Sequence, residues 1–109
     1  MDAIAVFMTA GSGDEASRIA ERLVEKQLAA CVQIIPQITS VYRWQGHVER
    51  QNEVFLIAKT VASNFAALES EVKKLHSYET PEIVAVPLSE SSPAYLKWLL
   101  ENVAGDKNA

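Results

Sequence analysis

Several features that mark secreted or membrane proteins are scarce in this sequence. Cysteine occurs once, at Cys31, so the chain has no internal disulfide. That usage is typical of a reducing compartment, and we expect a cytoplasmic protein. No apolar run reaches the ~18 residues that a membrane span needs. The segment Met1 to Ile4 has neither a basic start nor a long apolar stretch, so we expect no signal peptide and no membrane partner.

Positive charge is also sparse. The sequence has 10 lysines and arginines against 14 acidic residues, for a formal net charge of -4. The basic residues are scattered, and only Lys73 and Lys74 are adjacent. A nucleic-acid binder normally presents a basic face, so we expect no nucleic-acid partner. Neither a repeat nor a low-complexity segment interrupts the chain, and we expect one domain over residues 1–109.

Motifs for catalysis or for a closed metal site are missing as well. No C-x-x-C, H-x-x-x-H or H-E-x-x-H spacing occurs, which argues against a zinc site built by one chain. His76 is the best single metal candidate, because it ends a predicted helix near Glu79, although the helix dipole alone also favours histidine there. Cys31 and Lys59 are the residues an enzyme would use, but nothing marks a strained elbow or an oxyanion hole. We therefore expect no catalytic residues.

A glycine-rich turn has the outward form of a dinucleotide-binding fingerprint. Gly11 to Ala16 reads G-x-G-x-x-A between an apolar strand and a helix. Asp14 and Glu15 would face a pyrophosphate with two like charges, and the chain is too short for a doubly wound sheet. We interpret the segment as a turn before a helix that Ser12 caps, with Glu15 completing a Ser-x-x-Glu capping box.

What the sequence does contain is an unusually long hairpin. The segment Leu28 to Thr60 holds two apolar stretches on either side of Gln45-Gly46, where glycine supplies the positive φ of a tight turn. Each arm is roughly twice the usual ~5–6 residues of a strand. Pro36 cannot donate a ladder hydrogen bond, so it marks a bulge or an edge between a buried base and a projecting tip. A hairpin that outreaches its own core favours an oligomer.

The remaining elements complete a familiar order. Residues 3–8 are apolar throughout, as in a strand buried on both faces. We predict helices from Ser12 to Leu28, from the candidate cap Ser63 to Leu75 and from Ser92-Pro93 to Gly105, and a strand from Ile83 to Leu88. The order β-α-β-β-α-β followed by a C-terminal helix is the ferredoxin-like pattern, an α+β fold. Its two helices leave one sheet face bare, and either the last helix or another subunit must cover that face. Together with the projecting hairpin, this favours a symmetric homo-oligomer over a monomer.

Short motifs along nearly the whole chain resemble one protein family. They are Lys26–Val32 (KQLAACV), Ile35-Pro36, Thr39–Gly46 (TSVYRWQG), Glu53, Lys59-Thr60, Tyr78–Ile83 (YETPEI) and Tyr95–Leu99 (YLKWL). In these the chain resembles the CutA family, the divalent-cation tolerance proteins. The resemblance implies a ferredoxin-like fold and a tight homotrimer joined by long hairpins, similar to the PII signalling proteins. It also implies a part in tolerance of copper and other divalent cations, without agreed catalytic residues.

The resemblance also carries over the metal ligands of the bacterial members associated with copper. Their cysteine near the end of the first strand corresponds here to Met8, and their histidine pair corresponds to Leu75 and His76. Met8 keeps a sulfur, which suits Cu(I) but is a poor ligand for Cu(II) or Zn(II). Leu75 cannot ligate a metal. We therefore expect at most weak binding of Cu(II) or another divalent cation, at His76, and no other cofactor.

Other residues that recur in the family are candidates for a ligand cleft between subunits. They are Cys31, Trp44, Glu53, Lys59, Tyr78 and Glu82. Two functions follow as hypotheses. The first is a trimeric, non-enzymatic protein of the response to metal ions, and the alternative is a PII-like sensor that binds a small ligand in such clefts. Trp44, at the hairpin tip, fits a subunit interface as well as a ligand platform.

Overall fold

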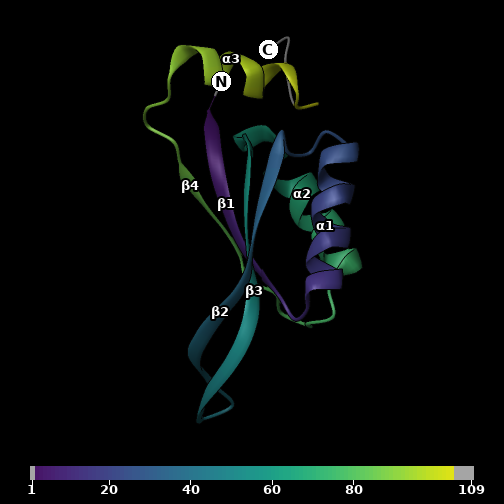
Figure 1. The fold of residues 1–109 in the computed structure, drawn as a ribbon, viewed down its shortest axis with the longest axis vertical. Helices are drawn as coiled ribbons and strands as arrows, with labels where there is room; N and C mark the ends of the chain where they lie inside the picture. The colour runs from purple at the N-terminus through teal and green to yellow at the C-terminus, as the bar shows by residue number, and fades with distance from the viewer. Residues whose placement is uncertain (1, 105–109) are drawn as a thin grey trace.

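The computed structural model describes residues 2–104. Within this range the elements are β1 (Ala3–Ala10), α1 (Gly13–Glu25), β2 (Cys31–Trp44), β3 (His47–Val61), a short 3-10 helix (Ala62–Asn64), α2 (Phe65–Leu75), β4 (Ile83–Pro87) and α3 (Pro93–Glu101). The strands form an antiparallel sheet in the order β2-β3-β1-β4. The predicted α+β, ferredoxin-like fold is confirmed, with α1 and α2 on one side of the sheet and α3 across one end (Figure 1).

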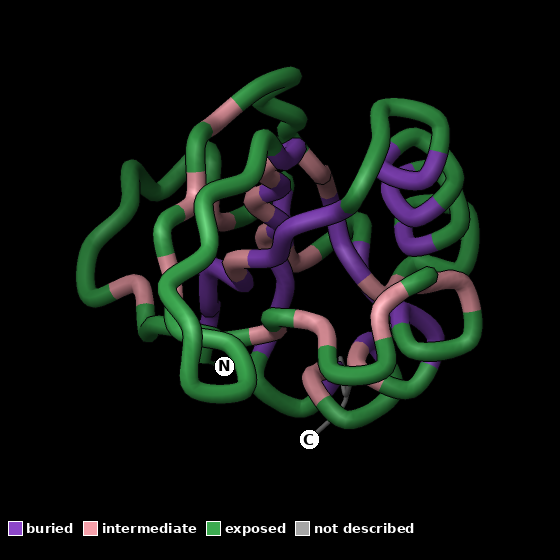
Figure 2. The backbone as a smooth tube through the Cα atoms, turned by 90° about the horizontal axis from the view of Figure 1, so that it is seen from below, coloured by how far each residue is buried: buried purple, intermediate pink, exposed green. Residues whose placement is uncertain are grey.

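The core lies between the sheet and these two helices. Val6 and Met8 of β1 are 0% exposed and pack against Ile19 and Leu23 of α1 and Leu68 of α2. Each such side chain stabilises the fold by roughly 1.5–3 kcal/mol through burial. Seen from below, buried segments gather in the middle of the molecule, and exposed segments surround them (Figure 2). The prediction of a central, buried first strand is confirmed.

The long hairpin predicted from the sequence is confirmed, since β2 has 14 residues and β3 has 15. Gln45 and Gly46 have φ values of 50° and 83°, the positive pair that a two-residue type I′ turn requires. The pairing register shifts between Ile35 and Ile38, where Pro36 and the next residue oppose one residue of β3. Pro36 was predicted to mark a bulge or an edge, and it lies in a bulge of β2, which is an edge strand of the sheet. The hairpin projects beyond the rest of the domain, and the longest dimension is 46 Å (Figure 1).

The helix starts agree with the sequence only in part. Ser12 Oγ accepts the N–H of Glu15 at 3.2 Å, which confirms the predicted cap. The carboxylate of Glu15, however, accepts the N–H of Gly11 and not that of Ser12. The prediction that Ser63 caps α2 is wrong. Ser63 lies inside the 3-10 turn, and Asn64, whose side chain donates to a threonine of β3, is the residue before α2.

The last helix begins as predicted, with Ser92 Oγ accepting the N–H of Tyr95 and Pro93 at its first position. It ends at Glu101, and the predicted stop at Gly105 lies outside the described residues. None of the helices in the described chain is long and apolar enough to cross a membrane.

The sheet face away from α1 and α2 is apolar and largely bare. Phe7 and Phe55 stack on it with ring centroids 5.8 Å apart, and Val84, which pairs with Phe7, is 51% exposed. Leu99 of α3 packs on Val61 and covers only one end of the sheet. We call this surface the bare face. Its exposed apolar side chains are those expected where another surface packs.

Candidate functional site

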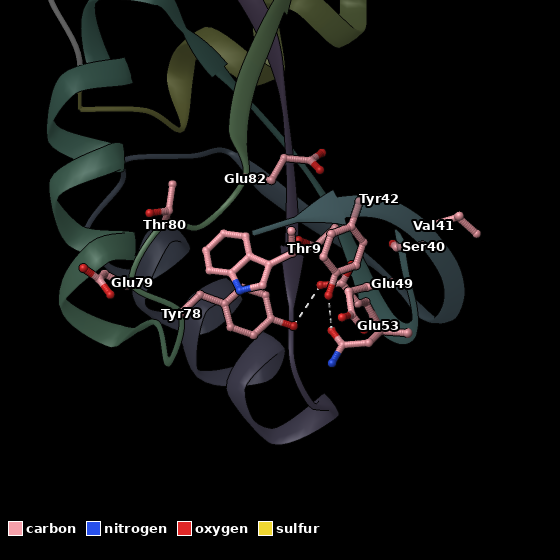
Figure 3. Close-up of a pocket in the computed structure, with 12 residues that line it drawn as sticks. Thr9, Ser40, Val41, Tyr42, Glu49, Glu53, Tyr78, Glu79, Thr80 and Glu82 are labelled. Carbon is pink, nitrogen blue, oxygen red and sulfur yellow. Dashed lines mark hydrogen bonds between the residues drawn. The ribbon is translucent and has the colours of Figure 1, made fainter. Parts of the chain in front are cut away.

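A cleft of about 670 Å³ opens on the bare-face side, at the hairpin. Its walls come from β2 and β3, from the end of β1 and from the loop between α2 and β4 (Figure 3). The predicted residues Trp44, Glu53, Tyr78 and Glu82 all line it. We call it the hairpin cleft. Its volume lies within the roughly 300–1,000 Å³ of small-molecule sites.

The bulge decides which side chains of β2 reach the hairpin cleft. Side chains of paired residues on neighbouring strands point to the same face of the sheet. On the N-terminal side of the bulge, the odd-numbered residue Ile35 of β2 therefore points to the bare face. On the C-terminal side of the bulge, the even-numbered residues of β2 point to that face. Tyr42 and Trp44 therefore line the cleft. A ladder without the bulge would bring Val41 and Arg43 to the same side. An irregularity in one strand thus selects aromatic side chains for the site.

Tyr78 and Glu53 form the closest polar contact inside the cleft. Tyr78 Oη donates to Glu53 Oε2 at 2.8 Å (Figure 3). Burial of the phenol, together with the bond to Glu53 and its negative charge, raises the pKa of Tyr78 well above the usual 10.0. Tyr78 is therefore a neutral donor at physiological pH. Nearby, Tyr42 Oη donates to Gln51 Oε1 at 2.7 Å.

His76 positions the loop that carries Tyr78. The His76 side chain is fully buried, and its Nδ1 accepts the N–H of Tyr78 at 3.0 Å. Because Nδ1 accepts, Nε2 carries the proton and donates to the carbonyl of Thr9 at 2.7 Å. The two rings also pack together, with centroids 4.6 Å apart. The imidazole thus ties the loop to the end of β1.

Glu15 is a buried anchor beneath the same loop. Its Oε1 accepts the N–H of Gly11 at 3.0 Å, and its Oε2 accepts the N–H of Ser77 at 2.9 Å. Burial opposes the charge, but these backbone bonds outweigh it and hold the pKa of Glu15 below its usual 4.5. The sequence pattern identified Glu15 only as part of a helix cap. The hydrogen bond between Glu15 and Ser77 could not be predicted from a local motif, because the two residues are 62 positions apart in the sequence.

The residues that correspond to the copper ligands of the family do not meet at an open position. Met8 is 0% exposed inside the core, and Leu75 packs against the same core. Both ring nitrogens of His76 already have hydrogen-bond partners. Among residues 2–104, no three His, Cys, Asp or Glu side chains converge as a metal centre requires. Metal binding at His76 stays a prediction, and it would require one of these hydrogen bonds to break.

Two of the six predicted cleft residues lie elsewhere in the chain. Cys31 and Lys59 pair across β2 and β3 at the base of the hairpin. Cys31 Sγ lies 3.5 Å from Tyr95 Oη, and Lys59 Nζ donates to Gln33 Oε1 at 2.6 Å. Within one chain the candidates therefore form two separate groups. A cleft that joins both groups across subunits stays a prediction.

A ferredoxin-like domain with an extended hairpin between its second and third strands defines a narrow class of proteins. The model of the CutA1 divalent ion tolerance protein family matches residues 4–102. The chain belongs to this family, and the resemblance noted in the sequence is confirmed.

Relatives of this chain come from several lineages. A divalent-cation tolerance protein CutA from Thermus thermophilus is 50% identical over 97 residues, which cover 89% of this chain and 94% of the relative. A solved structure of a divalent cation tolerance protein (Cut A1) from that species has a TM-score of 0.92 at 47% identity, and the match covers 94% of this chain and 99% of that one.

Two further relatives extend the comparison. The structure of a CutA from Archaeoglobus fulgidus, described as periplasmic, has a TM-score of 0.89 at 43% identity and covers 92% of this chain and 97% of that one. A CutA homolog of Xenopus laevis is 44% identical over 95 residues, which are 87% of this chain but only 63% of the frog protein. The chain thus spans less than two thirds of that relative.

Proposed function

We propose that this chain acts in the response to divalent cations as a non-enzymatic homotrimer in the cytoplasm. The observation that carries the proposal is its membership, over residues 4–102, of a family of divalent ion tolerance proteins. The hairpin cleft supports a binding role, because it presents carboxylates, hydroxyls and aromatic rings around an open volume.

Direct metal binding in this proposal is weak and uses His76. A metal ion must displace the Tyr78 amide from Nδ1 or the Thr9 carbonyl from Nε2H. Leaving a buried polar group without a partner costs about 1–3 kcal/mol, which lowers affinity roughly 5- to 150-fold. Neither Met8 nor Leu75 offers a strong second ligand to offset that cost.

Calorimetry with Cu(II), Cu(I) and Zn(II) tests the His76 site. The variants are His76→Ala and the matched control His47→Ala, which removes the other histidine of the chain, exposed at the hairpin turn. We expect weak binding that survives in His47→Ala and disappears in His76→Ala, with circular dichroism confirming that both variants fold. Equal binding in the two variants would exclude His76 as a ligand.

The bare face supports the trimer in this proposal, because an apolar sheet surface is stabilised when it packs against another copy. Native mass spectrometry of the wild type should give three chains. Val84→Glu adds a charge to the bare face, whereas Val24→Glu adds one to α1 at a similar exposure, 43% against 51%. We expect the first to dissociate the trimer and the second to leave it intact. A monomeric wild type would overturn the proposal.

The second candidate function is a sensor that binds a small ligand in the hairpin cleft. The observation that favours it is the meeting of Trp44, Glu53, Tyr78 and Glu82 around one open volume. Saturable binding of a small molecule, weakened by Trp44→Ala, would support it. Binding unchanged by that substitution would locate the ligand elsewhere.

A further inference from the structure

The imidazole of His76 forms hydrogen bonds in two directions. Its Nδ1 accepts the N–H of Tyr78 at 3.0 Å, which folds the start of the loop at residues 76–82 back on itself, and its Nε2 donates to the carbonyl of Thr9 at 2.7 Å. Pairing between β1 and β4 ends at Met8, so Thr9 lies one residue beyond that ladder. One ring therefore shapes the 76–82 loop and fastens it to the end of β1.

The space around this ring is filled from within the same chain. The side chain of His76 is 0% exposed and that of Glu15 is 5% exposed, and Glu15 Oε1 lies 3.6 Å from Nδ1 of the ring. The Tyr78 ring packs on the imidazole and also lies over Gly11, where an added Cβ atom would be 3.3 Å from Tyr78 Cε1. Because the imidazole is already buried within one chain, other copies that pack on the bare face neither supply nor remove its contacts.

A metal ion on His76 does not fit the 76–82 loop as it stands. Metal ligation uses the lone pair of a ring nitrogen at about 2.0–2.1 Å. The lone pair of Nδ1 is directed at the Tyr78 amide, and Nε2 donates to Thr9. Met8 and Leu75, at the other ligand positions of the family, belong to the core. The closed loop thus uses both nitrogens that a metal ion would need.

We propose that His76 is a latch that holds the 76–82 loop on the end of β1, and that the latched loop closes the imidazole to metal ions. The latch needs no metal, because its partners are the Tyr78 amide and the Thr9 carbonyl. Only an open loop frees a ring nitrogen, so the apparent affinity for a metal ion falls in proportion to the fraction of open loop. In this second part the inference rests on the weak metal binding proposed above, and it adds what controls that binding.

Amide hydrogen exchange of the full chain in EDTA tests the latch. In His76→Ala, exchange of the Tyr78 amide should rise at least about fivefold, since two hydrogen bonds of the loop are lost, while core amides of β3 keep their rates. His47→Ala is the matched control, because His47 is exposed at the hairpin turn. His76→Asn places an amide oxygen near the position of Nδ1, so it should restore part of the protection of Tyr78.

Three results of the exchange experiment would overturn the latch. Wild-type protein whose Tyr78 amide loses protection in EDTA would owe its ordered loop to a metal ion. A Tyr78 amide as protected in His76→Ala as in the wild type would show that the ring does not hold the loop. Equal exchange in His76→Asn and His76→Ala would show that the volume of the ring, and not its hydrogen bond, is what matters.

A pair of glycine variants tests the closure of the imidazole without changing the ring. Gly11→Ala adds a methyl group 3.3 Å from Tyr78 Cε1 and crowds the closed loop, whereas Gly13→Ala adds one in open space and is the matched control. We expect Gly11→Ala to raise the exchange of the Tyr78 amide. Zn(II) binding measured by calorimetry should tighten by the same factor, about threefold or more, because both follow the fraction of open loop.

The two experiments separate this inference from the metal binding on which its second part rests. If Zn(II) bound neither the wild type nor Gly11→Ala while the exchange results held, metal binding at His76 would be excluded and the latch confirmed. Equal Zn(II) affinity in Gly11→Ala and Gly13→Ala, despite faster exchange in the first, would overturn the closure of the imidazole.

Discussion

Replacing Glu15 with alanine should destabilise the fold and release the loop before β4. The substitution leaves the N–H groups of Gly11 and Ser77 without their acceptor. A hydrogen bond to a charged group contributes roughly 1.5–3 kcal/mol, and two are lost. Because both N–H groups belong to exposed residues, water replaces part of that energy. We therefore expect a loss of about 2–4 kcal/mol in the free energy of unfolding.

The effect of Glu15 should depend on pH in a defined direction. The pKa of Glu15 in the folded protein lies below its usual 4.5. A carboxylate of this kind contributes stability that is complete above the unfolded pKa and is lost as pH falls through the folded one. The difference between wild type and Glu15→Ala should therefore be constant near neutral pH and shrink below about pH 4.5.

Urea unfolding followed by circular dichroism measures both effects, at one protein concentration because assembly would shift apparent stability. Asp14→Ala is the matched control, since Asp14 is an exposed acid in the same helical turn. The Asp14→Ala variant loses only the favourable interaction of the carboxylate with the helix dipole, about 0.3–1 kcal/mol. If Glu15→Ala cost no more than Asp14→Ala, or if its effect did not change with pH, the buried-anchor interpretation of Glu15 would be refuted.

Three further predictions concern the core, the cleft and the helix surface. Leu68→Ala, at a side chain that is 0% exposed, should cost about 2–5 kcal/mol in urea unfolding, while Val48→Ala on the hairpin should stay within about 0.5 kcal/mol. In an alkaline titration followed by ultraviolet absorbance, Glu53→Gln should shift the ionisation of Tyr78 to lower pH, and an unchanged curve would contradict the bond between them. Glu71→Gln should lower stability more at low salt than at high salt, because Glu71 pairs with three largely exposed cations, and equal losses would exclude an ionic contribution.

Much of the fold was predictable because its signals are local. An uninterrupted apolar run predicts β1, the glycine at position 46 predicts the hairpin turn, and Pro36 predicts a break in the strand ladder. The start of α2 was mispredicted because a serine near a helix start is a good local cap, whereas Asn64 is held by a tertiary bond to Thr60 that no local pattern reveals.

The candidate site was predictable only in its residue types. Trp44 and Tyr78 were identified as cleft residues and do line one cleft. The role of His76 was not visible, because a histidine at a helix end looks like a free ligand until its two nitrogens are found bonded to Thr9 and Tyr78. Tertiary contacts between distant segments decide such roles.

The bulge shows how a single inserted residue controls the chemistry of the cleft. The sequence indicates that the ladder breaks near Pro36, but it does not reveal how many residues the break contains, and that number sets which alternate side chains face the cleft. With the observed insertion, Tyr42 and Trp44 face the carboxylates. Without it, Arg43 would lie on the same side of the hairpin as these carboxylates. The lining of the hairpin cleft therefore includes no arginine because the bulge directs Arg43 to the opposite side of the hairpin.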